Sequence, residues 1–431
     1  MRALALIDGE HYPEVVRDAL AALPYEVVGA VMLGGTEKLR GDEPDYGVPL
    51  WDDLADALAQ LEIDAVVDLS DEPVVGPRRR FRLASRVLAA GVPYLGADFR
   101  LDPVAFAPID VPALAVIGSG KRVGKTAVAG HVARLLADTR RLVVVAMGRG
   151  GPEDPVVTEA SPTVEDLLAL SRAGQHAASD YLEDAALAGV TTVGARRCGG
   201  GLAGSPFFSN VEDAARLAAS LEPDLVLLEG SGAAIPPVEA ARRLLVAGGH
   251  QDAETVAGYL GAYRLLLSDL VVLTMCEEPL ATPAHVETVR AAIADVDPRL
   301  PVIATVLRPR PVEPVEGRRV AYFSTAPAAI HDRLRAHLER EHGAEVVLLS
   351  GALANREQLR SELASPEAAR ADVVLVEIKA AAIDVVAEAA AERGVQVVFA
   401  DNEVQPLPGE PALDDLVLAL ADAVAAEGVA A

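Results

Sequence analysis

The residues from 118 to 126 have the composition and spacing of a phosphate-binding loop, between an apolar run at 113–117 and a helical pattern. The nine residues are Gly118, Ser119, Gly120, Lys121, Arg122, Val123, Gly124, Lys125 and Thr126. Backbone N–H groups of such a loop, together with the N-terminus of the following helix, bind phosphate oxygens. In this motif the lysine reaches the β- and γ-phosphates, and the hydroxyl group that follows it is a Mg²⁺ ligand. We therefore expect these nine residues to bind ATP, with Lys125 catalytic and Thr126 holding Mg²⁺; the alternative is a glycine-rich turn without a ligand.

The length of the loop carries further information. Five residues separate Gly118 from Gly124, whereas the usual pattern has four. Dethiobiotin synthetase and its relatives share this longer loop. Partition-type ATPases carry an additional lysine five positions before the P-loop lysine, and Gly120 occupies that position here. The loop therefore resembles the synthetase side of this superfamily more closely.

A carboxylate that could help to bind Mg²⁺ ends the apolar run 224–229. This residue, Glu229, is followed by Gly230-Ser231-Gly232. The carboxyl end of a strand is the edge at which open α/β sheets bind their ligands. We expect Glu229 to be catalytic and to hold Mg²⁺ together with Thr126, although acidic residues also end many strands without any function.

Two further loops follow strand-like runs and combine arginine with glycine. In the first, 147–154, we expect Arg149 to act as a catalytic anion clamp and Glu153 (or Asp154) to lie near Mg²⁺. An ordinary surface turn is the alternative reading of this loop.

The second such loop begins with Arg196 and Arg197. Both arginines, with the backbone N–H groups of Gly199, Gly200 and Gly201, could bind a polyanion. A flexible loop is the alternative. The intervening Cys198 is expected to be a small buried residue rather than a nucleophile.

The first strand-like run, 2–7, is followed by Asp8-Gly9-Glu10-His11. His11 in this loop could be a base or could contact the substrate. An exposed loop histidine without a function is the commoner case.

The overall composition limits the possible partners. Of the 431 residues, 51% are apolar, which is ample for large cores, and the formal net charge is −26. Such acidity argues against general nucleic-acid binding and against binding to an anionic membrane surface. Two cysteines are too few for a disulfide framework. The N-terminus has no signal-peptide pattern, so we expect a cytoplasmic protein.

Alternating strand and helix patterns predict an α/β protein with three units. A first unit has expected strands at 2–7, 26–32 and 64–69, and ends near the proline-containing segment 103–112. The central unit has expected strands at 113–117, 141–147, 191–195, 224–229, 269–274 and 301–307, and a helix at 211–221 with Asn210 as its N-cap. The proline-rich stretch 308–315 is expected to separate it from a third unit, with strands near 319–323, 344–349, 372–377 and 396–400.

These patterns predict a central P-loop NTPase domain with a parallel sheet, flanked by two smaller Rossmann-like α/β domains. The expected domain ranges are 1–108, 109–312 and 313–431.

Taken together, these motifs resemble the cyclic 2,3-diphosphoglycerate synthetases. The segments that carry the resemblance are 6–13, 118–126, 147–152, 197–204 and 228–232, with 376–381 and 398–402 near the C-terminus. The likeness covers nearly the whole chain. It implies ATP- and Mg²⁺-dependent closure of 2,3-diphosphoglycerate to its cyclic diphosphate, with release of ADP and phosphate, in a homodimer.

The resemblance also suggests roles for individual residues. Arg149, Arg196 and Arg197 would bind the substrate phosphates, and Lys379, after a strand of the third unit, would be a further substrate contact. Two rival functions stay open: a kinase that phosphorylates a phosphoglycerate, and a non-catalytic partition-type ATPase switch. Against the switch stands Gly120, because that class has a lysine at this position.

Overall fold

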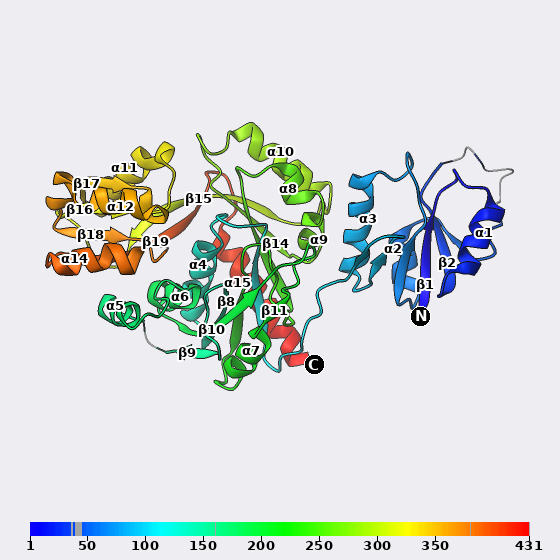
Figure 1. Cartoon of the computed structure of the whole chain (residues 1–431), viewed down its shortest axis with the longest axis horizontal. Coiled ribbons are helices and arrows are strands. Elements are labelled where there is room, and N and C mark those ends of the chain that lie inside the picture. The colour runs from blue at the N-terminus through cyan, green and yellow to red at the C-terminus, as the bar shows by residue number, and fades with distance from the viewer. Residues whose placement is uncertain (36–37, 39–44, 160, 380, 431) are drawn as a thin grey trace.

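The computed structural model describes residues 1–35, 38, 45–159, 161–379 and 381–430 as three α/β units arranged in a row (Figure 1). The N-terminal unit lies at one end, the central unit contains the phosphate-binding loop, and the C-terminal unit lies at the other end. Within these residues, no helix has both the length and the apolar composition of a bilayer span.

The N-terminal unit is a six-stranded sheet in the order β3-β2-β1-β4-β5-β6, parallel except for the last pair. Its strands are β1 (Arg2–Ile7), β2 (Glu26–Met32), β3 (Leu50–Trp51), β4 (Ala65–Asp68), β5 (Tyr94–Leu95) and β6 (Arg100–Leu101). Its helices are α1 (Pro13–Ala22), α2 (Leu54–Gln60) and α3 (Pro77–Ala89). The short apolar runs of this unit form buried parallel strands because helices cover them.

The central unit is built on seven parallel strands in the order β10-β8-β12-β7-β13-β14-β15. The strands are β7 (Ala113–Gly118), β8 (Leu142–Gly148), β10 (Thr191–Cys198), β12 (Leu225–Glu229), β13 (Arg242–Gly248), β14 (Leu270–Thr274) and β15 (Val302–Pro311). Two short strands, β9 (Val156–Thr158) and β11 (Phe208–Ser209), pair antiparallel with β10. The helices are α4 (Lys125–Ala137), α5 (Val164–Arg172), α6 (Asp180–Ala188), α7 (Val211–Ala219), α8 (Ala253–Ala257), α9 (Gly261–Leu266) and α10 (Pro283–Ala294).

The C-terminal unit continues the same sheet instead of starting a separate one. Its strands β16 (Arg319–Phe323), β17 (Glu345–Ser350), β18 (Val373–Val376) and β19 (Gln396–Pro406) run parallel to one another in the order β17-β16-β18-β19. The long strand β19 then pairs antiparallel with β15, and both strands bridge the two units in Figure 1. The helical segments are η1 (Ala328–Ile330), α11 (His331–His342), η2 (Ala352–Ala354), α12 (Arg356–Leu363), α13 (Pro366–Ala369), the π-helix η3 (Ala382–Ala387), α14 (Glu388–Glu392) and α15 (Leu413–Ala430).

The last helix, α15, returns to the central unit. It packs against α4, β7 and β13, and its Leu413, Val417 and Val424 are buried in one core with residues of these elements. The predicted third domain, 313–431, therefore contains a helix that covers the central sheet.

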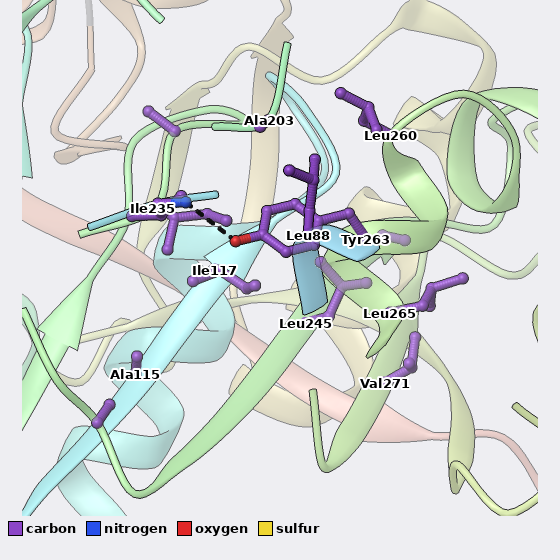
Figure 2. Packing of buried hydrophobic residues seen from close by; sticks show 14 of the residues in the cluster. Leu88, Ala115, Ile117, Ala203, Ile235, Leu245, Leu260, Tyr263, Leu265 and Val271 are labelled. Atoms are coloured by element: carbon purple, nitrogen blue, oxygen red, sulfur yellow. Dashed lines mark hydrogen bonds between the residues drawn. The ribbon is translucent and has the colours of Figure 1, made fainter. Parts of the chain in front are cut away.

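The N-terminal and central units share a continuous apolar core. Figure 2 shows Leu88 of α3 beside Tyr263 of α9 and Leu245 of β13. The Tyr263 hydroxyl accepts a hydrogen bond of 3.1 Å from the backbone N–H of Val104, in the segment that joins the two units. Arg78 and Glu254 form an ion pair of 2.6 Å across the same contact.

Several details differ from the sequence predictions. Strand β13 was not predicted, although its apolar stretch is buried between β7 and β14. The stretch 308–315 was expected to be a linker, but its first residues form the end of β15. There Pro309 and Pro311 lie opposite residues of β19 in the antiparallel pair. Proline is tolerated there because β14 pairs only with the start of β15 and needs no donor from these positions. Asn210 precedes α7, but its side chain makes no capping hydrogen bond.

Candidate active site at the phosphate-binding loop

The phosphate-binding loop joins the carboxyl end of β7 to the first residue of α4. Gly124 has φ 77°, in the left-handed region, and a Cβ added there would lie 2.9 Å from Leu307 Cδ1. A Cβ at Gly118 would lie 2.7 Å from the carbonyl oxygen of Gly232. The two glycines are therefore required by backbone conformation and by close approach, respectively.

The predicted lysine and carboxylate meet. Lys125 Nζ donates a hydrogen bond to Glu229 Oε1 at the end of β12, and the two side chains are 10% and 1% exposed. Although burial alone would raise the pKa of Glu229, the Lys125 ammonium and its hydrogen bonds hold that pKa below the ordinary value. Burial alone would lower the pKa of Lys125, but Glu229 and then Asp180 raise it. The pair is thus charged in the absence of a ligand.

Three further carboxyl groups from α6 surround this pair. Asp180, Glu183 and Asp184 occupy positions i, i+3 and i+4 of the helix, so they share one face. Burial, and then the Glu229 charge, raises the pKa of Asp180 and raises that of Asp184 well above its ordinary value. Burial also raises the pKa of Glu183 to about 8.

Asp184 and Glu229 form a buried carboxyl pair. Within the described part of the chain, no N–H group and no hydroxyl group donates to either Asp184 oxygen or to Glu229 Oε2. Two adjacent buried carboxyl groups avoid repulsion when one of them keeps its proton. A protonated Asp184 donates to Glu229, which agrees with the opposite directions of their pKa shifts.

Positive charge gathers on the other side of the loop, around Gly232. A Cβ placed on Gly232 would lie 2.9 Å from Arg149 Nη2, 3.6 Å from Arg197 Nη2 and 3.8 Å from Lys121 Cγ. Arg197 Nη2 donates to the backbone oxygen of Ser231 at 2.7 Å. Burial, followed by the neighbouring Arg149, lowers the pKa of Arg197. Arg149, Arg197 and Lys121 can therefore bind an anion in front of the 230–232 turn.

The loop after β10 was predicted to bind a polyanion through its arginine side chains and its glycine N–H groups, and its geometry agrees with this in part. Arg197 Nη1 donates to the carbonyl oxygen of Gly199 at 2.7 Å, which fixes the start of the loop. Gly200 lies against this guanidinium, and the Gly201 N–H is already used in a turn with Ser205. Cys198 is exposed, contrary to the expected burial, because the pairing of β10 with β8 ends at Arg196 and Cys198 pairs only with the short edge strand β11.

Arg196 does not join Arg197. Successive strand residues point to opposite faces of a sheet. The Arg196 side chain lies 3.9 Å from Glu153 Oε1 and over the ring of Phe208, at 6.0 Å from its centroid. The Glu153 side chain is 85% exposed, whereas the carboxylates beside Lys125 are buried. Arg196 and Glu153 therefore form a surface pair away from the Lys125–Glu229 pair.

Lys379 reaches the acidic face of α6 from the C-terminal unit, with its Nζ 3.6 Å from Glu183 Oε1. His11 remains in the N-terminal unit, where its Nδ1 lies 2.8 Å from Asp8 Oδ1. In Figure 1, α3 lies between β1 and the central unit, so the structure keeps the loop after β1 apart from the phosphate-binding loop.

The sequence prediction missed two contributions to the site. The first is the acidic face of α6, whose signal is the Asp-x-x-Glu-Asp spacing at 180–184. The second is Gln251, whose Oε1 accepts hydrogen bonds from the Ser119 hydroxyl at 2.6 Å and from Gly248 N–H at 2.9 Å. Gln251 follows β13, and no motif marks it in the sequence.

Comparisons with known proteins agree along the whole chain. Family models described as the N-terminal, P-loop and C-terminal domains of cyclic 2,3-diphosphoglycerate synthetase match residues 2–102, 113–306 and 311–403. The chain is 54% identical over 438 residues to the synthetase of that name from Rubrobacter xylanophilus, with 98% of each chain covered. It is 42% identical over 425 residues to that from Methanothermus fervidus, covering 93% of this chain and 92% of the relative. Among solved structures, LpxK from Aquifex aeolicus in complex with ATP is similar over 73% of this chain and 90% of its own, at 15% identity and a TM-score of 0.42.

Proposed function

This chain belongs to the cyclic 2,3-diphosphoglycerate synthetase family, and from this membership we propose that it uses ATP to close 2,3-diphosphoglycerate into its cyclic diphosphate. The observation that carries the proposal at the site is the buried Lys125–Glu229 pair at the phosphate-binding loop. On ATP binding, Lys125 would exchange one partner of this pair for phosphate oxygens. Glu229 would then be free for the metal.

The residues around Glu229 fit a magnesium ion. Glu229 Oε2 is buried, and apart from a shared carboxyl proton no donor from the described residues reaches it. Thr126 follows Lys125 at the start of α4. Among the described residues, no three acidic, histidine or cysteine side chains form a ready-made metal cluster. Mg²⁺ commonly keeps water and phosphate ligands beside one or two protein groups, and it neutralises charge on the phosphates. Thr126 and Glu229 would therefore hold it, and the exposed Glu153 is not needed.

The cationic group at Gly232 supports binding of a phosphorylated acid. Arg149 and Arg197 both direct Nη atoms to this turn, and the buried Nε of Arg197 has no acceptor within the described chain. A phosphate oxygen would satisfy this donor, and an Arg–phosphate contact is one of the stronger hydrogen bonds available. Lys379, on the side of α6, is the cation that would receive the second phosphate.

The chemistry follows from the charges of the substrate. An oxygen of one substrate phosphate attacks the γ-phosphorus of ATP, and the bond to ADP breaks. The second substrate phosphate then attacks the first phosphorus and expels inorganic phosphate, which carries the former γ-phosphorus. The cations hold both anions in line, and they stabilise the negative charge that gathers in each transition state.

Labelled ATP tests this route against the rival kinase. With label in the γ-phosphate, the proposed route sends all label into inorganic phosphate and leaves the cyclic product unlabelled. Stable label in the product, with ADP but without stoichiometric phosphate, would contradict the synthetase and favour a kinase.

The homodimer that the family resemblance implies is a separate proposal. Light scattering coupled to size-exclusion chromatography would give the mass directly, for comparison with the 44.9 kDa of one chain. A single monomeric species at working concentrations would refute it.

A further inference from the structure

Lys379 belongs by its backbone to the C-terminal unit. It lies in the turn after β18, which is closed by hydrogen bonds of 2.9 Å from Lys379 N–H to Glu377 O and from Ala382 N–H to Lys379 O. Its side chain is 34% exposed and leaves the C-terminal unit toward α6 of the central unit. A lysine ammonium on a four-carbon stem needs a partner to stay in one place.

The partner, Glu183, is held rigidly on α6. One side of this helix packs against α4, β8 and β10 of the central unit. The neighbouring Leu182 is buried in a core that also contains Phe323, Ile378 and Phe399 of the C-terminal unit. Helix α6 is therefore fixed to both units at once, and the Glu183 side chain is only 7% exposed.

Two of the other acids near Lys379, Glu377 and Asp401, already have partners. Glu377 accepts hydrogen bonds from Thr325 at 3.1 Å and from Asn402 at 3.2 Å. Asp401 pairs with Arg134 at 2.6 Å and with Arg310 at 2.9 Å. Asp180, one turn before Glu183, interacts electrostatically with Lys125, with Lys379 and with Arg149, whereas Glu183 Oε1 lies 3.6 Å from Lys379 Nζ.

We propose that Glu183 is a positioning residue that holds Lys379 of the C-terminal unit beside the phosphate-binding loop, ready to bind a phosphate of the acid substrate. The inference rests on the proposed function for the identity of that substrate. Because the next residue of α6, Asp184, contacts Glu229, holding Lys379 on Glu183 also fixes its distance from the Lys125 site. Without Glu183, the ammonium would have to be ordered by the substrate itself.

The kinetic test replaces Glu183 by methionine, which has a similar volume and no carboxyl group to pair with Lys379. In Glu183→Met, the KM for 2,3-diphosphoglycerate should rise about ten-fold, because the rotamer freedom of Lys379 is lost on binding. The KM for ATP should stay within about two-fold. In a Lys379→Met background the same change should add less than about two-fold, since coupled residues are not additive. Equal effects in both backgrounds, or an equal rise for ATP, would overturn the proposal.

A second measurement detects the Glu183–Lys379 pair without measuring enzyme turnover. The chain has four lysines, Lys38, Lys121, Lys125 and Lys379, so amine acylation can be mapped to each by mass spectrometry. Ionised Glu183 raises the pKa of Lys379 more than any other group. At pH 9, where Glu183 is ionised, Glu183→Gln, which keeps the shape of the side chain, should therefore increase acylation of Lys379 at least about three-fold. Lys38 in the N-terminal unit is the internal control and should not change.

The two measurements separate the possible failures. Unchanged acylation of Lys379 in folded Glu183→Gln would overturn the pairing whatever the substrate. If acylation rises but the wild-type protein neither binds nor turns over 2,3-diphosphoglycerate, the proposed function fails and the positioning of Lys379 by Glu183 stands.

Discussion

At the scale of single residues, the central feature is a lysine that is bound to a carboxylate before any nucleotide arrives. Lys125 and Glu229 are both buried, so each supplies the counter-charge that the other needs. Breaking a buried ion pair on one side leaves an uncompensated charge, which costs more than the pair itself is worth. The same two residues therefore affect both stability and catalysis, and the two effects can be separated.

Lys125→Ala should abolish turnover and should also lower the free energy of unfolding by about 3–5 kcal/mol, because Glu229 is left buried and unpaired. Adding Glu229→Gln should recover most of that stability without recovering activity. Chemical denaturation of the single and double variants measures the effect. A fully stable Lys125→Ala protein would show that water or another cation compensates Glu229.

Glu229→Gln alone should bind ATP and lose most of its turnover, because an amide does not supply the negative charge that holds Mg²⁺. Glu153→Gln is the matched control, and it should resemble the wild type because the Glu153 side chain is exposed. Rates measured across a magnesium titration distinguish the two variants. If Glu153→Gln loses turnover and Glu229→Gln does not, the metal position assigned to Glu229 is wrong.

Arg197→Ala and Arg196→Ala should differ, although the two residues are adjacent in sequence. Loss of a charge-assisted hydrogen bond costs about 1.5–3 kcal/mol. Such a loss corresponds to roughly 10- to 150-fold weaker binding of the acid substrate by Arg197→Ala. Arg196→Ala should change this affinity little, because its guanidinium lies beside Glu153 and Phe208. Calorimetric titration of both variants gives the comparison, and equal losses would contradict the geometry of β10.

At the scale of elements, the start of α4 and the two helices α5 and α6 determine the site. The phosphate-binding loop is shaped by backbone conformation, whereas the acidic face of α6 is placed by packing. Helix α6 carries the carboxyl groups to Lys125 because Leu182, together with Leu167 and Leu168 of α5, is buried in the core of the C-terminal unit. An insertion between β9 and β10 thus links a neighbouring unit to the phosphate site.

Gly124→Ala should weaken ATP binding and cost about 1–2 kcal/mol of stability, because an alanine there must adopt a left-handed conformation. The added Cβ would also approach Leu307 to 2.9 Å. Gly130→Ala, inside the helix α4 that Gly124 precedes, is the matched control. Its nearest neighbour would be Arg134 Nη1 at 3.4 Å, so it should be neutral or stabilise the protein by about 0.5–1 kcal/mol. Thermal unfolding with and without ATP tests both, and equal ATP affinities would contradict the assignment.

At the scale of the whole molecule, one sheet runs through the central and C-terminal units, and apolar cores join all three units. Two ionisable groups lie where the central and C-terminal units meet, the buried Glu183 and the partly exposed Lys379. The free energy of unfolding should therefore depend on pH through ionisable groups that lie between the units.

The sign of the Glu183 contribution follows from its pKa. The folded protein keeps the Glu183 proton up to a pKa of about 8, whereas the unfolded chain loses it near 4.5. The folded state therefore binds more protons between these values, and its free energy of unfolding should fall as the pH rises through this window. Glu183→Gln should lose less stability than the wild type between pH 5 and pH 9. Asp180 and Asp184 are present in both proteins, so the difference in urea denaturation isolates Glu183. Parallel pH profiles would show that its pKa is not raised.

The local chemistry of the chain could be predicted from its residues alone. The glycines, lysine and threonine of residues 118–126 form a motif whose expected conformation and role depend on immediate neighbours in the chain. The strand-end carboxylate Glu229 and the family resemblance likewise followed from motifs, and the family models and relatives confirmed the resemblance. Long apolar runs likewise predicted the α/β class, because such a run is a pattern of neighbouring residues in the chain.

The packed fold, by contrast, was needed to show which charged groups share a site. It separated Arg196 from Arg197 by the alternation of a strand, left His11 in another unit, and brought α6 and Lys379 to the phosphate-binding loop. These placements depend on packing between segments far apart in the chain. Burial raises the pKa values of Asp184 and Glu183, because desolvation acts on a group only once the surrounding units have assembled around it.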